Sequence, residues 1–218
     1  MVRYTKRITP DETNDFYRDG DFINYTLPQN IIDLHSIAKY FTAEVDSVFR
    51  YDDNTYLKRF LPTNPSCIID YLQIKRDGEI VQTINEYTLL NQMYVDIQDN
   101  YNKNSDGNKP DTISINTLNN ANNETIEYDF NNELNMPKKS YNYCISKWIG
   151  FFNGSSRYLD CRGKHVQITI RLSPKYITYR GLRLQGNHPI DAPFTKDVYY
   201  NYNISKCFMN MTVIQNEN

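Results

Sequence analysis

The sequence predicts an all-β protein built as an antiparallel sandwich or barrel, and three observations support this. Several segments alternate apolar and polar residues with a period of two, which is the spacing of a strand with one buried face. Turn-forming Gly, Pro, Asn and Asp residues separate these segments at short intervals. One segment has helical spacing, and no alternation of strands with helices indicates a parallel sheet.

Composition sets broad limits on the class of protein. The chain has 218 residues, of which 39% are hydrophobic and 14% aromatic, so it can bury a sizeable core and is not typical of a disordered protein. The formal charge of −2 gives no overall attraction to nucleic acid or membranes. Apolar runs such as 148–152 are too short to span a bilayer, and residues 1–7 are partly basic with no apolar stretch behind them. We therefore expect no membrane span and no signal peptide.

The first third of the chain is expected to contain an arm and two strands. Residues 1–20 are polar and rich in acidic side chains, so we expect an N-terminal arm or loop. Ile23, Tyr25 and Leu27 alternate with polar residues, which predicts a strand that ends at Pro28. A second strand region is expected over 31–49, followed by a turn at 51–54.

A hairpin and a helix give the clearest local pattern. Residues 67–75 and 80–84 both have strand composition, and Asp77-Gly78 between them tolerates the positive φ angles of a tight hairpin turn. Apolar residues then recur at helical spacing, at Tyr87, Leu90, Tyr94 and Ile97, which predicts a short amphipathic helix over 86–97 with these residues packed against the sheet.

A long Asn-rich loop is expected over 98–142. This stretch contains 13 of the 27 Asn residues of the chain, and a short strand at 126–130 could lie within it. We interpret it as an excursion from one domain that covers residues 21–218, rather than as a domain of its own.

The C-terminal third returns to strand patterns. The strongest alternation in the chain is at 165–172, and further strands are expected at 176–179 and 199–214, giving about eight to ten strands in all. For the core we predict Ile68, Tyr71, Leu72, Ile74, Ile84, Trp148, Val166, Ile168, Ile170 and Leu172.

Few residues suggest chemistry. His35, His165 and His188 occur in unlike contexts, and the sequence has no GxSxG, HExxH, CxxC or Walker motif, so we expect no enzyme, no catalytic or metal site and no cofactor. Two other patterns are weak candidates for metal ligands: Cys161 with His165, and the acidic turn 15–21. The four cysteines are widely spaced, and we expect buried thiols rather than disulfides at Cys67, Cys144, Cys161 and Cys207.

Charge is unevenly distributed along the chain. Residues 138–183 contain ten Lys and Arg and one acid, whereas residues 1–137 contain 12 basic and 22 acidic residues. The basic segment could contact a polyanion through arginines that lie close to tyrosines: Arg157, Arg180 and Arg183 with Tyr158, Tyr176 and Tyr179. We favour neutralisation between strands or subunits, because these arginines fall on several strands and loops. One continuous basic surface would reverse that preference.

Three segments, taken in order, resemble a known family. They are FINYTLPQNIIDLHSIAKYFTAEV (22–45), RFLPTNPSCIIDYLQIKRDGEIVQTINEYTLL (59–90) and WIGFFNGSSRYLDCRGKHVQITIRLSP (148–174). Their order is similar to that in the N-terminal jelly roll of the double-jelly-roll major capsid proteins of virophages and polinton-like DNA viruses. The hairpin here has Asp77-Gly78 where Asn-Gly is common in that family, which preserves the turn. Two jelly rolls need roughly twice this length, so a second barrel is missing from this chain. Either the chain is a fragment, or it is one barrel that assembles alone or with a separate partner chain.

The resemblance implies an all-β antiparallel jelly-roll sandwich with a structural role. Such a subunit would self-associate into homotrimers that tile an icosahedral shell, alone or with a separate second barrel. It would be found in the virion after assembly in the cytoplasm or nucleus of a host cell, with no direct nucleic-acid binding. The alternative left open by the residues themselves is a β-sandwich that binds a ligand such as a glycan through exposed Tyr and Asn side chains.

Overall fold

The computed structural model of the chain describes residues 2–46, 48–52, 55–60, 65–98, 138–173, 178–182 and 202–215. These residues form thirteen strands, one α-helix and two 3-10 turns. The strands are β1 (Val2–Ile8), β2 (Phe16–Arg18), β3 (Phe22–Thr26), β4 (Ile31–Asp46), β5 (Val48–Asp52), β6 (Thr55–Phe60), β7 (Ile69–Arg76), β8 (Glu79–Asn85), β9 (Lys138–Ile145), β10 (Tyr158–Asp160), β11 (Val166–Leu172), β12 (Thr178–Leu182) and β13 (Tyr202–Gln215). The helical elements are η1 (Pro65–Ile68), α1 (Tyr87–Gln98) and η3 (Gly150–Asn153).

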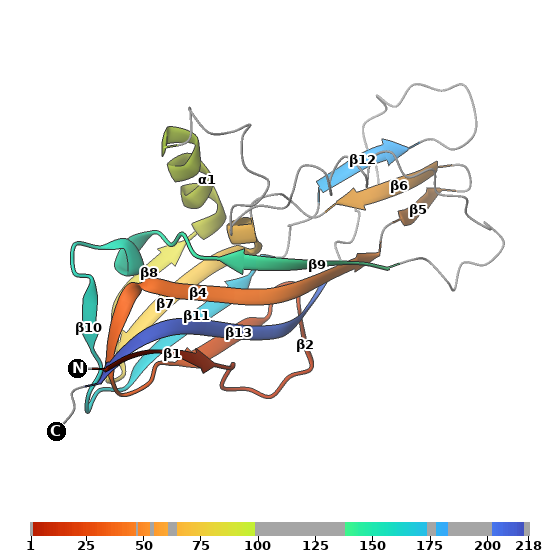
Figure 1. Ribbon diagram of the computed structural model, residues 1–218. Helices are drawn as coiled ribbons and strands as arrows, with labels where there is room; N and C mark the ends of the chain where they lie inside the picture. The colour runs from red at the N-terminus through yellow and green to blue at the C-terminus, as the bar shows by residue number, and fades with distance from the viewer. Residues whose placement is uncertain are drawn as a thin grey trace.

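Two antiparallel sheets form a sandwich. Sheet A has the order β1-β13-β4-β10. In addition, β2 pairs with β13 on the same side as β1, and β9 pairs with β4 on the same side as β10. Sheet B has the order β3-β11-β7-β8. Figure 1 shows the long strands β4 and β13 lying over β7 and β11, with both chain ends together at one end of the sandwich, where Val2 pairs with Gln215.

This strand order is that of a jelly roll. The chain crosses repeatedly between the sheets: β3 and β4, β8 and β9, and β10 and β11 each lie in different sheets, while β7 and β8 are neighbours in sheet B. The strands β1 and β13 are neighbours in sheet A. Because β1 and β2 share one edge of sheet A and β9 and β10 share the other, each sheet has four strand positions, as in the eight-stranded jelly roll. The expected all-β antiparallel jelly-roll sandwich with one short helix is therefore confirmed.

A third, small sheet is made from two connections of the barrel. Strands β5 and β6 follow β4, and β12 follows β11, giving the order β12-β6-β5. The predicted strand region 31–49 is thus divided, because β4 ends at Asp46 and β5 begins at Val48.

The core lies between sheets A and B and is filled by alternate residues of their strands. β11 alternates buried and half-buried residues along its whole length, as the sequence predicts. Eight of the ten predicted core residues are fully buried: Ile68, Leu72, Ile74, Trp148, Val166, Ile168, Ile170 and Leu172. Ile84 is half-buried and packs against this core, whereas the prediction for Tyr71 is wrong, because Tyr71 is half-buried on the other side of β7. Tyr71 is adjacent to Leu72 and therefore points to the opposite face of the sheet.

An irregular stretch of β4 is held by contacts from two other segments. The pairing of β4 with β13 shifts between Asp33 and Ala38, as in a β-bulge. There the Ser36 hydroxyl accepts a hydrogen bond from the Thr212 amide (2.7 Å), and the Trp148 indole donates to the Ile37 carbonyl (2.9 Å). Trp148 therefore satisfies a backbone group that the bulge removes from the ladder, in addition to filling the core.

The hairpin and the helix follow the sequence closely. Asp77 and Gly78 both have positive φ, 52° and 87°, as a tight hairpin turn requires. The helix α1 spans Tyr87–Gln98, against a prediction of 86–97.

Two predictions about loops need correction. The expected N-terminal arm contains strand β1, which pairs with β13 over its full length, and strand β2, so residues 2–8 and 16–18 belong to sheet A. The expected loop 98–142 ends early, because residues 138–142 lie in β9. The strand considered at 126–130 lies outside the described residues.

Candidate interaction surfaces

Arginines stand over aromatic rings on the outer face of sheet A. Arg7 of β1 lies over the Phe208 ring, with 4.1 Å between the guanidinium carbon and the ring centroid. Arg157 lies over the Tyr158 ring at 5.5 Å, and the Arg3 guanidinium donates to the Tyr158 hydroxyl at 3.4 Å. β1 and β10 are at opposite edges of this sheet, so these arginine–aromatic contacts extend from one edge of its outer face to the other.

The same face continues toward β2. Phe208 stacks on Tyr40 of β4, with ring centroids 4.9 Å apart and an angle of 12° between the rings. Arg18 lies 5.2 Å from the centroid of the exposed Phe16 ring, and Lys206 is exposed nearby on β13. We call the five cations of this surface the basic face: Arg3, Arg7, Arg18, Arg157 and Lys206.

One member of the basic face is paired with a carboxylate. Arg157 binds Asp33 through its Nε (3.0 and 3.2 Å) and Nη2 (2.9 Å), and the Asp33 carboxylate is almost fully buried. Asp33 also accepts the His35 amide, so it fixes both the β4 bulge and the segment before β10. In the part of the chain that the structure describes, no carboxylate forms an ion pair with the other four cations of this face.

The outer face of sheet B has a different character. One row of residues across it is polar, and its side chains are hydrogen-bonded to each other. The Thr169 hydroxyl donates to the Asn24 side-chain oxygen (2.8 Å), and the Gln73 side-chain amide donates to the Thr83 hydroxyl (3.3 Å). We call these four residues the amide face.

The neighbouring row of sheet B contains two aromatic residues and an ion pair. Arg171 is held by Asp70 and lies between the Phe22 and Tyr71 rings, 6.0 and 5.8 Å from their centroids. The two rings meet at 81°. This surface presents aromatic rings, but its arginine is already neutralised by a neighbouring carboxylate.

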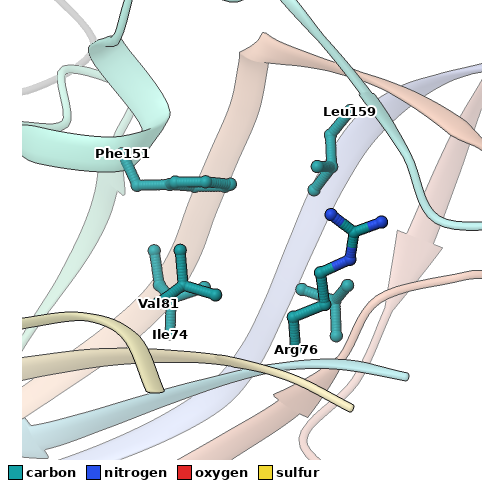
Figure 2. Close-up of a pocket in the computed structure, with 6 residues that line it drawn as sticks. Ile74, Arg76, Val81, Phe151 and Leu159 are labelled. Atoms are coloured by element: carbon teal, nitrogen blue, oxygen red, sulfur yellow. The ribbon is translucent and has the colours of Figure 1, made fainter. Parts of the chain in front are cut away.

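A small apolar hollow opens at the edge of the sandwich where β8 faces β10. It has a volume of about 70 Å³, and Figure 2 shows Phe151 and Leu159 on one side of it, with Ile74, Val81 and Arg76 on the other. Gly150 brings η3 against β8 here, since a Cβ at this position would lie 2.6 Å from the Gln82 side chain.

Large apolar side chains are exposed from β8 into α1. Five of them have exposed fractions between 45% and 60%: Ile80, Val81, Leu89, Leu90 and Met93. The opposite side of the helix packs inward through Tyr87 and Asn91, which are buried. Ile80 and Val81 lie at the hairpin end of β8, whereas Leu89, Leu90 and Met93 lie close together on α1. The three exposed side chains of the helix are therefore the better candidate for a contact surface.

A lysine is buried inside the sandwich. Lys39 of β4 is completely inaccessible; its ammonium donates to the Tyr25 hydroxyl (2.6 Å) and lies 4.7 Å from the Tyr25 ring centroid. Burial lowers the pKa of Lys39 to about 8, and the charge of nearby Cys207 partly opposes this shift. Burial raises the pKa of both Tyr25 and Cys207.

The residues considered for catalysis or metal binding lie apart. His35 is exposed on β4 of sheet A, His165 is exposed just before β11 of sheet B, and His188 lies outside the described residues. Cys161 is buried before a turn while His165 is exposed after it. In the acidic turn, the Asp21 carboxylate accepts the Arg18 amide. Across the described ranges, no three His, Cys, Asp or Glu side chains gather as metal ligands would.

The cysteine prediction is confirmed in part. Cys161 and Cys207 are buried and form no disulfide, whereas Cys144 is only half-buried. Nothing is described for the Cys67 side chain.

The predicted basic segment is only partly assembled into a surface. Arg157 and Tyr158 lie together on sheet A, while Tyr179 and Arg180 belong to β12. Tyr176 and Arg183 lie outside the described residues. The prediction missed Arg3, Arg7 and Phe208, although the alternation of Arg3, Thr5 and Arg7 with Val2, Tyr4 and Ile8 is a signal that could have located β1.

No helix within the described ranges is long and apolar enough to cross a membrane.

The fold places the chain among single-barrel jelly rolls, an architecture that viral capsid domains, lectins and cupins share. No family model and no curated protein matches the chain. Among solved structures, it is similar to a chain of a quasi-atomic model of the PBCV-1 virus capsid, with a TM-score of 0.48 and 10% identity over 98% of this chain and 42% of that one. The crystal structure of PBCV-1 VP54, fitted into a reconstruction of the virophage Sputnik, is similar to the same degree: TM-score 0.48, 10% identity, and 98% and 42% coverage. This chain spans less than half the length of either capsid chain.

Proposed function

We propose that this protein is a structural coat subunit of a virus, a jelly roll that self-associates into homotrimeric capsomers of an icosahedral shell in the virion. One observation carries the proposal: a jelly-roll barrel exposes three large apolar side chains close together on α1, Leu89, Leu90 and Met93. Water contact with this surface is unfavourable, so burial against another subunit would be a source of stability for an assembly. A second barrel, from a partner chain or a longer form of the protein, could complete the capsomer.

The proposed subunit contact is best tested at the exposed side of α1. Leu89 and Met93 are four residues apart and therefore adjacent on the helix surface. The double variant L89D/M93D places two charges in the contact and should convert trimers into monomers, because a buried unpaired carboxylate is strongly unfavourable. The matched control is V2D, which adds a charge at an exposed apolar residue of β1, on the opposite edge of the sandwich.

Light scattering during size-exclusion chromatography measures the outcome. We expect the wild type and V2D to have the mass of a trimer or a larger assembly, and L89D/M93D that of a monomer. A wild-type protein that stays monomeric at every concentration, with or without a partner barrel, would contradict the proposal of self-association.

A second candidate function is glycan binding, and one observation favours it. Phe22, with an exposed fraction of 49%, and Tyr71 meet at nearly a right angle on the open face of sheet B, beside the polar row of the amide face. Aromatic rings beside amide and hydroxyl groups suit the apolar faces and hydroxyls of a sugar. A glycan array on which the wild type and F22A give the same empty result would remove this candidate.

A further inference from the structure

We propose that the basic face of sheet A binds single-stranded nucleic acid. This inference goes beyond the role of a coat subunit and does not depend on it. It also revises the expectation from the sequence, in which the arginines were assigned to separate strands and loops. The sheet order brings residues from both ends of the chain and from β10 onto one continuous face.

The first argument is the charge on the outer face of sheet A. Five cations lie on it, and the described residues of β4 and β10 place three carboxylates on the same side, Asp33, Glu44 and Asp160, the last of which is paired with Arg162. Of these, Asp33 is already paired with Arg157. The remaining excess of positive charge has no counterpart on the outer face of sheet B, where Asp70 neutralises Arg171. A phosphate backbone is the polymer that such a face would attract.

The second argument is the way in which the arginines are held. Arg7 and Arg18 each lie over an aromatic ring, and Arg7 Nε also donates to the Asn210 side chain (3.5 Å), so both guanidinium groups are held at the surface of the sheet. The N–H groups of a guanidinium can bind two oxygens of one phosphate. Arg3 and Arg7 are four residues apart on β1, about 13 Å in a strand, which permits contacts to separate phosphates of an extended strand.

The third argument selects single strands over duplexes. Phe16 and Tyr158 expose nearly half of their surface beside Arg18 and Arg157. Exposed rings next to cations are the arrangement on which unpaired bases stack, and such stacking requires no particular base. The face is also a rigid β-sheet, so little ordering is needed on the protein side.

The test is fluorescence anisotropy of a labelled oligothymidylate of about 20 nucleotides, titrated with the full chain from about 50 to about 200 mM salt. We expect binding that weakens steeply with salt. The variant R3Q/R7Q should weaken binding at least about tenfold and reduce the slope against salt by about two. The variant R18Q/K206Q removes two charges from the other end of the face and should act in the same direction, which covers the case in which R3Q/R7Q fails to fold. The matched control is K75Q, on sheet B, which should stay within about twofold of the wild type.

Two further measurements separate nucleic acid from other anions. The variant F16A should weaken oligothymidylate binding about fivefold but leave inorganic polyphosphate binding unchanged, because only the former has bases that stack. The proposal is overturned if the wild type does not bind oligothymidylate at low salt, or if R3Q/R7Q binds as K75Q does. It is also overturned if R3Q/R7Q changes the mass of the assembly without changing oligothymidylate binding, since the face would then be a contact with the acidic surface of another copy.

Discussion

The two outer faces of the sandwich differ more than its two inner faces do. Inside, both sheets contribute the same kind of residue, mostly Ile, Leu, Val and Tyr. Outside, sheet A carries arginines that lie over aromatic rings, while sheet B carries an amide row and an arginine neutralised by Asp70. The inner sets are constrained by a shared core, and the outer sets are free to diverge. The outer side chains, rather than the core, therefore indicate what each sheet can bind.

The comparison is clearest in the two Arg–Asp pairs, one on each face. On sheet A the Asp33 carboxylate has an exposed fraction of only 8%, and on sheet B that of Asp70 is 24%. Arg157 and Arg171 are both about half exposed. The pairs are chemically alike, so their different burial predicts different contributions to stability.

The largest effect is expected when each carboxylate is removed in turn. D33A loses a bidentate ion pair and the acceptor of the His35 amide, so it should lower the free energy of unfolding by about 2–3 kcal/mol. D70A removes a more solvated pair and should cost at most about 1 kcal/mol. Urea denaturation of the two variants measures both values.

Double variants with the arginines complete this experiment. If loss of the Asp33–Arg157 pair causes the lower stability of D33A, the double variant D33A/R157A should have a free energy of unfolding no lower than that of D33A. Equal losses for D33A and D70A would show that burial does not distinguish the two faces.

A smaller effect is expected from the lysine enclosed between the faces. Lys39 is buried with one oxygen acceptor, the Tyr25 hydroxyl, among the described residues, so replacing it by Met should stabilise the fold by about 1–2 kcal/mol at pH 7. Y25F should have the opposite sign, because it leaves the ammonium in place and removes its acceptor.

The pH dependence gives this second prediction a sharper form. The pKa of Lys39 is lowered to about 8 in the folded protein, so between pH 8 and its ordinary value of 10.5 the unfolded chain binds more protons. The wild type therefore gains stability from this group as the pH rises above 8. We expect the free energy of unfolding of K39M to exceed that of the wild type by a constant amount below pH 8, and by a smaller amount above it. Denaturation from pH 7 to pH 9.5 measures this difference. An advantage that widens with pH would contradict the assignment.

The sandwich was predictable where the two sides of a strand differ in polarity. β11 has apolar residues on one side and polar residues on the other, so local alternation was sufficient, and Asp77-Gly78 located the hairpin. β1 was missed because its inward side includes Lys6 and because its partner, β13, lies at the other end of the chain. Ile84 packs against the core but is only half-buried, because β8 is an edge strand of sheet B.

The basic face could not be predicted from sequence for a related reason. Arg3 and Tyr158 are 155 residues apart in the sequence and meet only because β1 and β10 join the same sheet. The helix α1 was predicted from the spacing of its apolar residues, but spacing alone assigned Leu90 to the packed side, and the structure exposes it. Which apolar side of a helix is covered depends on the neighbouring elements, and these are set by the strand order.

The smallest effect is expected at a third Arg–Asp pair, at the end of β10. Asp160 accepts hydrogen bonds from the side chain and the amide of Arg162, and these lower the pKa of Asp160 to about 2. Both side chains are more than half exposed, so R162Q should leave the midpoint of thermal unfolding at pH 7 unchanged within error. The pKa of Asp160, followed by NMR through its carboxyl carbon, should rise in R162Q toward the ordinary value of 3.8.

The sign of the pH effect at this third pair follows from the lowered pKa. The stabilisation from Asp160 is present above the pKa of the unfolded chain and is lost as the pH falls toward about 2, so any difference between R162Q and the wild type should disappear at low pH. A loss of stability of R162Q at pH 7 as large as that of D33A would mean that solvent exposure does not determine how much each Arg–Asp pair contributes to stability. The contrast between a buried pair that stabilises sheet A and solvated pairs that do not would then fail.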